Sequence, residues 1–287
     1  MNHIAGNKTK RNLVIFSFIS LTIGWIGVFI DTLIPDQPKG NTMGMGIWLI
    51  TPLITALLLR TFAGDRWNDT GFLPGFKRNI KWYVLSFFIF PVLIFVVISI
   101  GSLLKWIDIS SFSTGSFFPV FIGSLLPLLI KNFFEESIWR GYLTSKLLTL
   151  KTNDFQLYLF VSLVWGFWHL PYNLIFLPYS DIQMVLPGSR FQFIFINFIS
   201  IVFLSVLYTE IYRAAKSIWP TVILHTISNA LVNTLLLDGF IKISQGKELL
   251  ISPAIGIIPI VLYFIFALLL RKHRIKMQRT SPSSGHV

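Results

Sequence analysis

Two adjacent glutamates, Glu135 and Glu136, are the most reactive side chains in an otherwise apolar stretch, and Arg140 follows Glu136 by four residues. On a helix this spacing places Glu136 and Arg140 on one face, where they can form an ion pair. Glu135 points about 100° away around the helix, which leaves it as the freer carboxylate and a candidate general base. The alternative is a solvated helix end, since ion pairs also occur without a chemical role.

A second candidate is His169, which ends the motif W-G-F-W-H inside another apolar stretch. An ionisable residue within a membrane span is costly and is a functional candidate by default. Trp165 precedes it by one helical turn and could pack against the imidazole. Gly166 would let a neighbouring helix approach closely. The alternative is a histidine that only forms a structural hydrogen bond.

The third group is His225 and Asn229, which are also four residues apart and share one helix face. Together they offer two hydrogen-bond donors directed at one point. This arrangement suits an oxyanion, whose stabilisation is often a large part of catalysis. The alternative is hydrogen bonding between helices, for which membrane proteins also use histidine and asparagine.

Several other hydrolytic chemistries lack their residues in this chain. The sequence has no cysteine, which excludes thiolate nucleophiles, cysteine metal ligands and disulfides. It has neither a G-x-S-x-G nucleophile motif nor an H-E-x-x-H zinc motif. Asp31, Asp154 and Asp238 lie near the ends of apolar stretches and form no pair within one. Glutamate and histidine therefore remain as the groups that could activate a water.

The elements that must position these residues are membrane helices. The chain is 54% hydrophobic and 13% charged, whereas soluble domains carry about 25% charged residues. Apolar stretches of about 20 residues mark membrane spans, so we expect an all-α, polytopic transmembrane helical bundle. The eight predicted spans are 13–35, 46–63, 82–104, 116–136, 156–177, 191–209, 217–237 and 251–270, and the fourth helix can continue to about residue 148. The three groups fall on the fourth, fifth and seventh spans.

The distribution of basic residues predicts the orientation. Lysines and arginines in the loops and tails divide seventeen to five between alternate sides of the eight spans. Cytoplasmic loops carry the excess of basic residues, so both termini are expected in the cytoplasm. The net charge of +12 is then explained by topology, and we expect no nucleic-acid partner. The predicted organisation is a basic N-terminus at 1–12, a transmembrane domain at 13–271 and a basic, polar cytoplasmic tail at 272–287.

In order, spacing and placement on separate spans, the three groups resemble the CPBP intramembrane peptidases, which include the CAAX prenyl endopeptidases and the bacterial Abi proteins. The family pattern is E-E-x-x-x-R, F-x-x-x-H and H-x-x-x-N. It corresponds here to Glu135-Glu136 with Arg140, Trp165 with His169, and His225 with Asn229. The resemblance covers a motif core at about residues 131–233. Tryptophan replaces the usual phenylalanine at position 165, one aromatic residue for another.

The resemblance implies an intramembrane endopeptidase that cleaves a membrane-associated peptide or a prenylated CAAX-like C-terminus. By position, it implies that Glu135 and His169 activate a water, and that His225 and Asn229 hold the developing oxyanion. Three further residues would have supporting roles: Glu136, Arg140 and Trp165.

Whether a metal takes part is left open by the sequence. Glu135, His169 and His225 could form a catalytic zinc site with one open position. No pair of ligands is closely spaced in the sequence, however, so metal-free Glu/His chemistry without a cofactor is favoured.

Other functions stay open at this point. A non-catalytic bacteriocin-immunity or scaffold protein could share the fold. A proton-coupled transporter could use buried glutamate and histidine, although no inverted repeat is visible and the polar residues cluster on one side. The expected partners are a peptide or lipidated peptide and the lipid bilayer. The compact chain suits the bacterial type, which predicts a multi-pass protein of the bacterial cell membrane.

Overall fold

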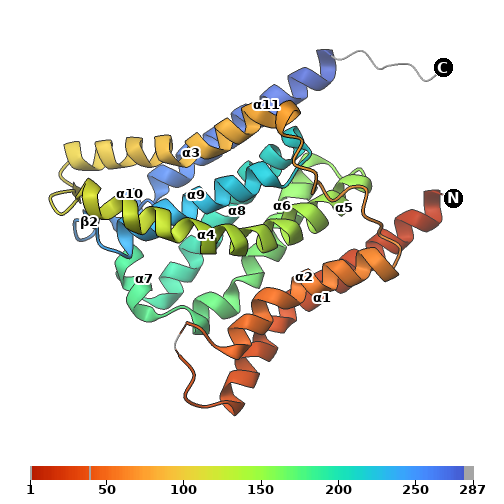
Figure 1. The fold of residues 1–287 in the computed structure, drawn as a ribbon, viewed down its shortest axis with the longest axis horizontal. Helices are drawn as coiled ribbons and strands as arrows, with labels where there is room; N and C mark the ends of the chain where they lie inside the picture. Colours follow the sequence, from red (N-terminus) through yellow and green to blue (C-terminus); the bar gives the residue numbers. More distant parts are fainter. Residues whose placement is uncertain (1, 39, 281–287) are drawn as a thin grey trace.

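The computed structural model describes residues 2–38 and 40–280, which form a bundle of long helices (Figure 1). The longer helices are α1 (Asn2–Leu33), α2 (Met43–Phe62), α3 (Phe76–Leu103), α4 (Thr114–Ile138), α6 (Asp154–Trp168), α8 (Arg190–Ala215), α9 (Trp219–Leu236) and α11 (Ile257–Thr280). The short ones are α5 (Ser145–Thr149), α7 (Tyr179–Val185), α10 (Glu248–Ile251) and two π-helical segments, η1 (Trp139–Thr144) and η2 (Tyr172–Phe176). The prediction of an all-α bundle is confirmed.

Strand structure in the described residues is limited to one antiparallel pair, β1 (Ile107–Asp108) and β2 (Lys242–Ile243). This pair joins the loop after α3 to the loop after α9. The start of α1 and the end of α11 lie toward the same end of the bundle (Figure 1). Residues 281–287 of the predicted tail lie outside the described residues.

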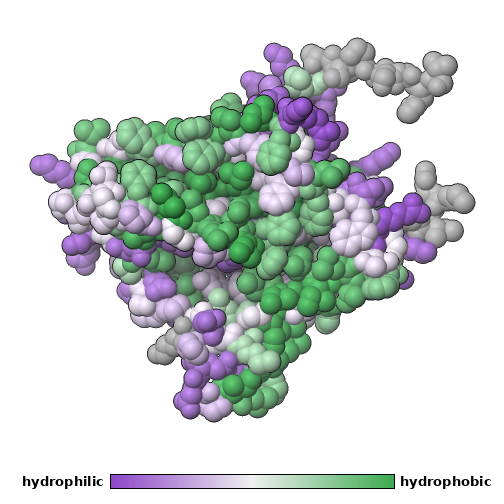
Figure 2. Space-filling view, viewed as in Figure 1, coloured by the Kyte–Doolittle hydropathy of each residue, from purple (hydrophilic) through white to green (hydrophobic). Residues whose placement is uncertain are grey.

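Six helical segments of the described chain are long and apolar enough to cross a membrane. They are Gly6–Leu33, Met43–Phe62, Phe76–Leu103, Thr114–Thr149, Asp154–Phe176 and Arg190–Ala215. They coincide with the first six predicted spans. The helices α9 and α11 correspond to the last two predicted spans but are not among the segments that are long and apolar enough to cross a membrane. The total of eight spans therefore stays a prediction. Figure 2 shows hydrophobic residues over the middle of the bundle and hydrophilic residues gathered at its ends.

Two of the predicted helix boundaries can be compared with the structure, and one is right while the other is wrong. The fourth helix continues through η1 and α5 to Thr149, which confirms its expected extension. The last predicted span, 251–270, is wrong at its start, because α11 begins only at Ile257. Pro253 explains the difference: the residue before a proline avoids helical angles, and Ser252 is extended, with ψ 122°.

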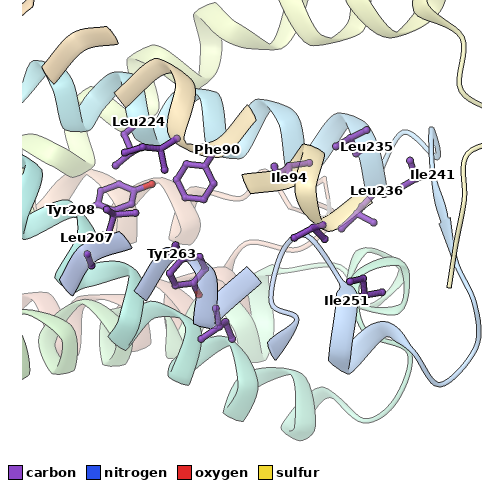
Figure 3. Packing of buried hydrophobic residues seen from close by; sticks show 14 of the residues in the cluster. Phe90, Ile94, Leu207, Tyr208, Leu224, Leu235, Leu236, Ile241, Ile251 and Tyr263 are labelled. Atoms are coloured by element: carbon purple, nitrogen blue, oxygen red, sulfur yellow. The ribbon is translucent and has the colours of Figure 1, made fainter. Parts of the chain in front are cut away.

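The helices pack around two hydrophobic clusters. In the larger one, α3, α8, α9 and α11 contribute residues such as Phe90, Leu207, Leu224 and Tyr263, which point toward one another in Figure 3. In the second, tryptophans of α2, η1 and α6 pack with α1. Gly166 allows α8 to approach, since a Cβ there would lie 2.7 Å from the Phe198 ring. The predicted close helix approach at Gly166 is confirmed.

Candidate active site

A cavity of about 490 Å³ brings the four predicted catalytic residues together. Glu135 of α4, His169 at the end of α6, and His225 and Asn229 of α9 all line it. Trp165 lines it as well. The three motifs are separated by dozens of residues in the sequence, so their convergence on one cavity is a property of the fold.

Behind this lining, the predicted pair of Glu136 and Arg140 is present. Arg140 Nη1 lies 3.1 Å from Glu136 Oε1, and both side chains are fully buried. The same oxygen lies 2.9 Å from Nδ1 of His225. A carboxylate can only accept hydrogen bonds, so Nδ1 of His225 carries the hydrogen and donates it. Glu136 thus links Arg140 to the histidine of another helix, a contact that the sequence analysis missed.

Aromatic rings enclose this buried ion pair. The guanidinium carbon of Arg140 lies 4.4 Å from the centroid of the Trp165 ring and 4.7 Å from that of Tyr208. Both rings also meet the imidazole of His225 edge-on, with interplanar angles of 80° and 89°. Cation–π contacts compensate part of the cost of burying a guanidinium. Tyr208 of α8 was not singled out in the sequence, where it stands in a stretch without a motif.

The ring of His169 is fixed in a similar way. Its Nδ1 lies 2.8 Å from the backbone oxygen of Trp165, which can only accept, so Nδ1 carries the hydrogen. Trp165 and Trp168 meet the imidazole edge-on, with centroids at 5.8 Å and 4.7 Å. The predicted packing of Trp165 on His169 is therefore confirmed. In a neutral ring the remaining nitrogen, Nε2, is a hydrogen-bond acceptor.

The prediction that Glu135 is the freer carboxylate is wrong. Lys131 Nζ lies 2.6 Å from Glu135 Oε1, again at a spacing of four residues. Each glutamate therefore has one basic partner on its own helix. The second oxygen of Glu135, Oε2, is buried and has no hydrogen-bond partner among the described residues. The same i, i+4 rule that predicted the Glu136–Arg140 pair could have revealed this one.

Asn229 is positioned by an asparagine that the sequence analysis did not identify. Asn229 Nδ2 donates to Asn132 Oδ1 at 3.2 Å, and Asn132 Nδ2 in turn lies 3.5 Å from Thr226 Oγ1. A side-chain amide carries two donor hydrogens, so Asn229 keeps one for another acceptor. The only available signal was an asparagine within an apolar helix, one turn before Glu135 and Glu136.

The first turn after the two glutamates is a π-helix, η1, which contains Arg140. The side-chain hydroxyl of Thr144 donates a hydrogen bond to the backbone oxygen of Trp139, five residues earlier. Single π-helical turns within α-helices often occur at functional sites. Here the wide turn includes the fully buried side chains of Trp139, Arg140 and Tyr142.

Carboxylate and imidazole are suitable zinc ligands, and Glu135, His169 and His225 all line the cavity. As placed in the described chain, no three histidine, aspartate or glutamate side chains form a group that could hold a metal ion.

Residues 116–231 match the protein-family model described as type II CAAX prenyl endopeptidase Rce1-like. The matched segment contains all four cavity residues of the predicted site. No curated protein matches the chain.

Proposed function

Because residues 116–231 belong to the CAAX prenyl endopeptidase family, we propose that the chain is an intramembrane endopeptidase that uses a water activated by Glu135 and His169. Its substrate is a membrane-associated peptide or a prenylated CAAX-like C-terminus. Three helical segments that overlap the matched residues, Thr114–Thr149, Asp154–Phe176 and Arg190–Ala215, are long and apolar enough to cross a membrane, which suits a substrate held at the bilayer by a lipid.

The observation that carries the proposal is the set of unused acceptors in one cavity. Glu135 Oε2 has no partner among the described residues. His169 donates through Nδ1, which leaves Nε2 as an acceptor. A water between two such acceptors loses a proton to one of them as it attacks the scissile carbonyl carbon. That proton then passes to the amine nitrogen as the C–N bond breaks, which is general acid–base catalysis.

His225 can stabilise the oxyanion in one specific form. With Nδ1–H donating to Glu136, a neutral ring has no hydrogen on Nε2 and cannot donate from that atom. The imidazolium form can, and Glu136 stabilises it as a carboxylate stabilises the histidine of a serine-protease triad. Asn229 supplies a second donor through its remaining amide hydrogen. Arg140 contacts the same carboxylate oxygen of Glu136 as His225 does.

The test is cleavage of prenylated and non-prenylated membrane peptides by the purified protein in detergent. We expect the Glu135→Ala, His169→Ala and His225→Ala variants each to abolish cleavage while their unfolding temperatures stay near that of the wild type. His273→Ala is the matched control, since His273 is an exposed residue of α11. Full cleavage by all three variants, or no cleavage by the wild type, would refute the peptidase function and favour a non-catalytic role.

A strong chelator distinguishes metal-free from zinc chemistry. Unchanged activity after chelation and desalting agrees with the Glu/His mechanism. Loss of activity that zinc restores would assign Glu135, His169 and His225 to a metal instead.

A further inference from the structure

Lys131 has a charge whose position the proposed mechanism does not explain. It lies in the middle of the apolar α4, where a lysine costs about 2.5–3.5 kcal/mol when it faces lipid. Among the described residues it is the only lysine or arginine that lines the catalytic cavity. Its side chain is 38% exposed, whereas that of its partner Glu135 is 2% exposed. The ammonium therefore faces the cavity, not the protein interior.

The ammonium has unused hydrogen-bonding capacity. It has three donor hydrogens, and its hydrogen bond in the described chain goes to Glu135 Oε1 at 2.6 Å. Two of the three hydrogens can reach a molecule in the cavity. The lysine stem is flexible, so the ammonium can leave Glu135 without movement of the helix.

Among the described residues that line the cavity, an anion would find no other lysine or arginine to pair with. The lining is mostly apolar, and besides Glu135 its acidic residue is Asp181, which would repel an anion. An unpaired charge in apolar surroundings is strongly disfavoured. A peptide substrate cleaved near its C-terminus carries one obligatory anion, the α-carboxylate.

We propose that Lys131 is the binding site for the α-carboxylate of the substrate and that this carboxylate replaces Glu135 as its partner. The inference rests on the proposed peptidase function. The α-carboxylate ends the released peptide, so it lies beyond the scissile bond by about 3.3–3.6 Å for each residue of an extended chain. When it binds Lys131, it therefore draws the ammonium away from the base. The exchange also frees Glu135 Oε1, so that either carboxylate oxygen can accept the proton of the attacking water. Lys131 thus selects substrates with a free C-terminus and keeps Glu135 paired until one binds.

The test uses two prenylated peptides that differ only at the C-terminus, one with a free carboxylate and one with a carboxamide. Hydrogen bonds to charged groups contribute about 1.5–3 kcal/mol, so we expect the wild type to prefer the carboxylate by about 10- to 100-fold in kcat/KM. Lys131→Gln should lower that ratio to near one, mainly by slowing the carboxylate peptide. Lys131→Arg should retain a preference, and Lys77→Gln, an exposed lysine in the first turn of α3, should leave the ratio unchanged.

Two results would overturn the inference: a wild-type ratio near one, or an unchanged ratio in Lys131→Gln. Both differ from a failure of the proposed function, in which the wild type cleaves neither peptide. A measurement on the wild type alone covers the case in which the variants do not fold. The released short peptide should inhibit more strongly as a carboxylate than as an amide, and equal inhibition would exclude the site.

Discussion

Two regions of the molecule bury charged side chains but use their polar atoms differently. The first is the catalytic cavity. The second, which we name the loop clamp, consists of Arg60, Asp65, Asp69, Tyr142 and Lys146, and it fastens the loop between α2 and α3 to the η1–α5 segment. In the clamp, Arg60 contacts Asp69 at 2.6 Å and Lys146 contacts it at 2.8 Å. Tyr142 donates to Asp65 at 2.6 Å.

The remaining donors of the clamp are used as well. Arg60 also donates to the backbone oxygens of Arg66 and Gly141 and to Ser145 Oγ, and Lys146 donates to the backbone oxygen of Asp65. Around the cavity, by contrast, Oε2 of both Glu135 and Glu136 has no partner among the described residues. Buried polar atoms are normally satisfied. The charged groups of the clamp therefore hold two segments together, whereas Glu135, which lines the cavity, has one carboxylate oxygen without a partner among the described residues.

The largest effect is expected where the clamp loses its central cation. Arg60→Met leaves Asp69 with one basic partner, and it removes a hydrogen-bond donor from each of two backbone oxygens, those of Arg66 and Gly141. Breaking a buried ion pair from one side costs about 3–5 kcal/mol, so the free energy of unfolding should fall by about that amount. Denaturation in detergent micelles measures it. Arg78→Gln, an exposed arginine of α3, is the control, and an equal effect of the two variants would contradict the structural role of the clamp.

A second prediction concerns Glu136. It forms a buried ion pair with Arg140, like the ion pairs of the clamp, and it also contacts His225 of the catalytic cavity. Glu136→Gln removes the carboxylate that orients His225. Loss of such an orienting partner lowers activity by about 10- to 100-fold in metal sites, and we expect kcat to fall by about the same factor here. It also leaves Arg140 buried without its anion, so the variant should unfold more easily. The kcat for peptide cleavage and the unfolding temperature are the two measurements.

The double variant Glu136→Gln with Arg140→Met separates these effects. Replacing a whole buried ion pair with neutral side chains is often neutral for stability, so the unfolding temperature should recover toward that of the wild type. The kcat should stay low, because His225 still lacks its carboxylate. Recovery of both quantities would mean that Glu136 only compensates Arg140.

Spacing within one helix was enough to predict much of this site. The apolar stretches predicted the bundle, and the interval of four residues predicted the Glu136–Arg140 pair. The same interval was not applied to Lys131 and Glu135, and the predicted freedom of Glu135 failed for that reason.

Contacts between helices could not be predicted in this way. Glu136 meets His225 across 89 positions, and Asn132 meets Asn229 across 97. Periodicity shows which face of a helix is polar, but not which face of a distant helix it meets. Those pairings depend on the packing of α4 against α9, which the apolar pattern leaves undetermined.

A smaller effect is expected at Asn132, which acts on the cavity only through Asn229. Asn132→Ala removes the acceptor that holds the Asn229 amide, and a hydrogen bond of this kind contributes about 1 kcal/mol. We expect kcat to fall by about fivefold to tenfold with KM little changed. Steady-state cleavage kinetics measure this, and Asn132→Asp, which keeps the acceptor, should lose less. An unchanged kcat in Asn132→Ala would mean that Asn229 needs no positioning.

The smallest effect should come from Gly166, where packing alone is at stake. Alanine gains roughly 0.8–1 kcal/mol of helix propensity over glycine, but its Cβ would lie 2.7 Å from the Phe198 ring, and overpacking costs about 1–3 kcal/mol. The net loss for Gly166→Ala should therefore be about 1 kcal/mol, measured by unfolding. At Gly123 of α4 a Cβ meets nothing within 4 Å, so Gly123→Ala keeps the propensity gain without the clash. If both alanines stabilise the protein, the contact between α6 and α8 is looser than 2.7 Å implies, and His169 is not held by that contact.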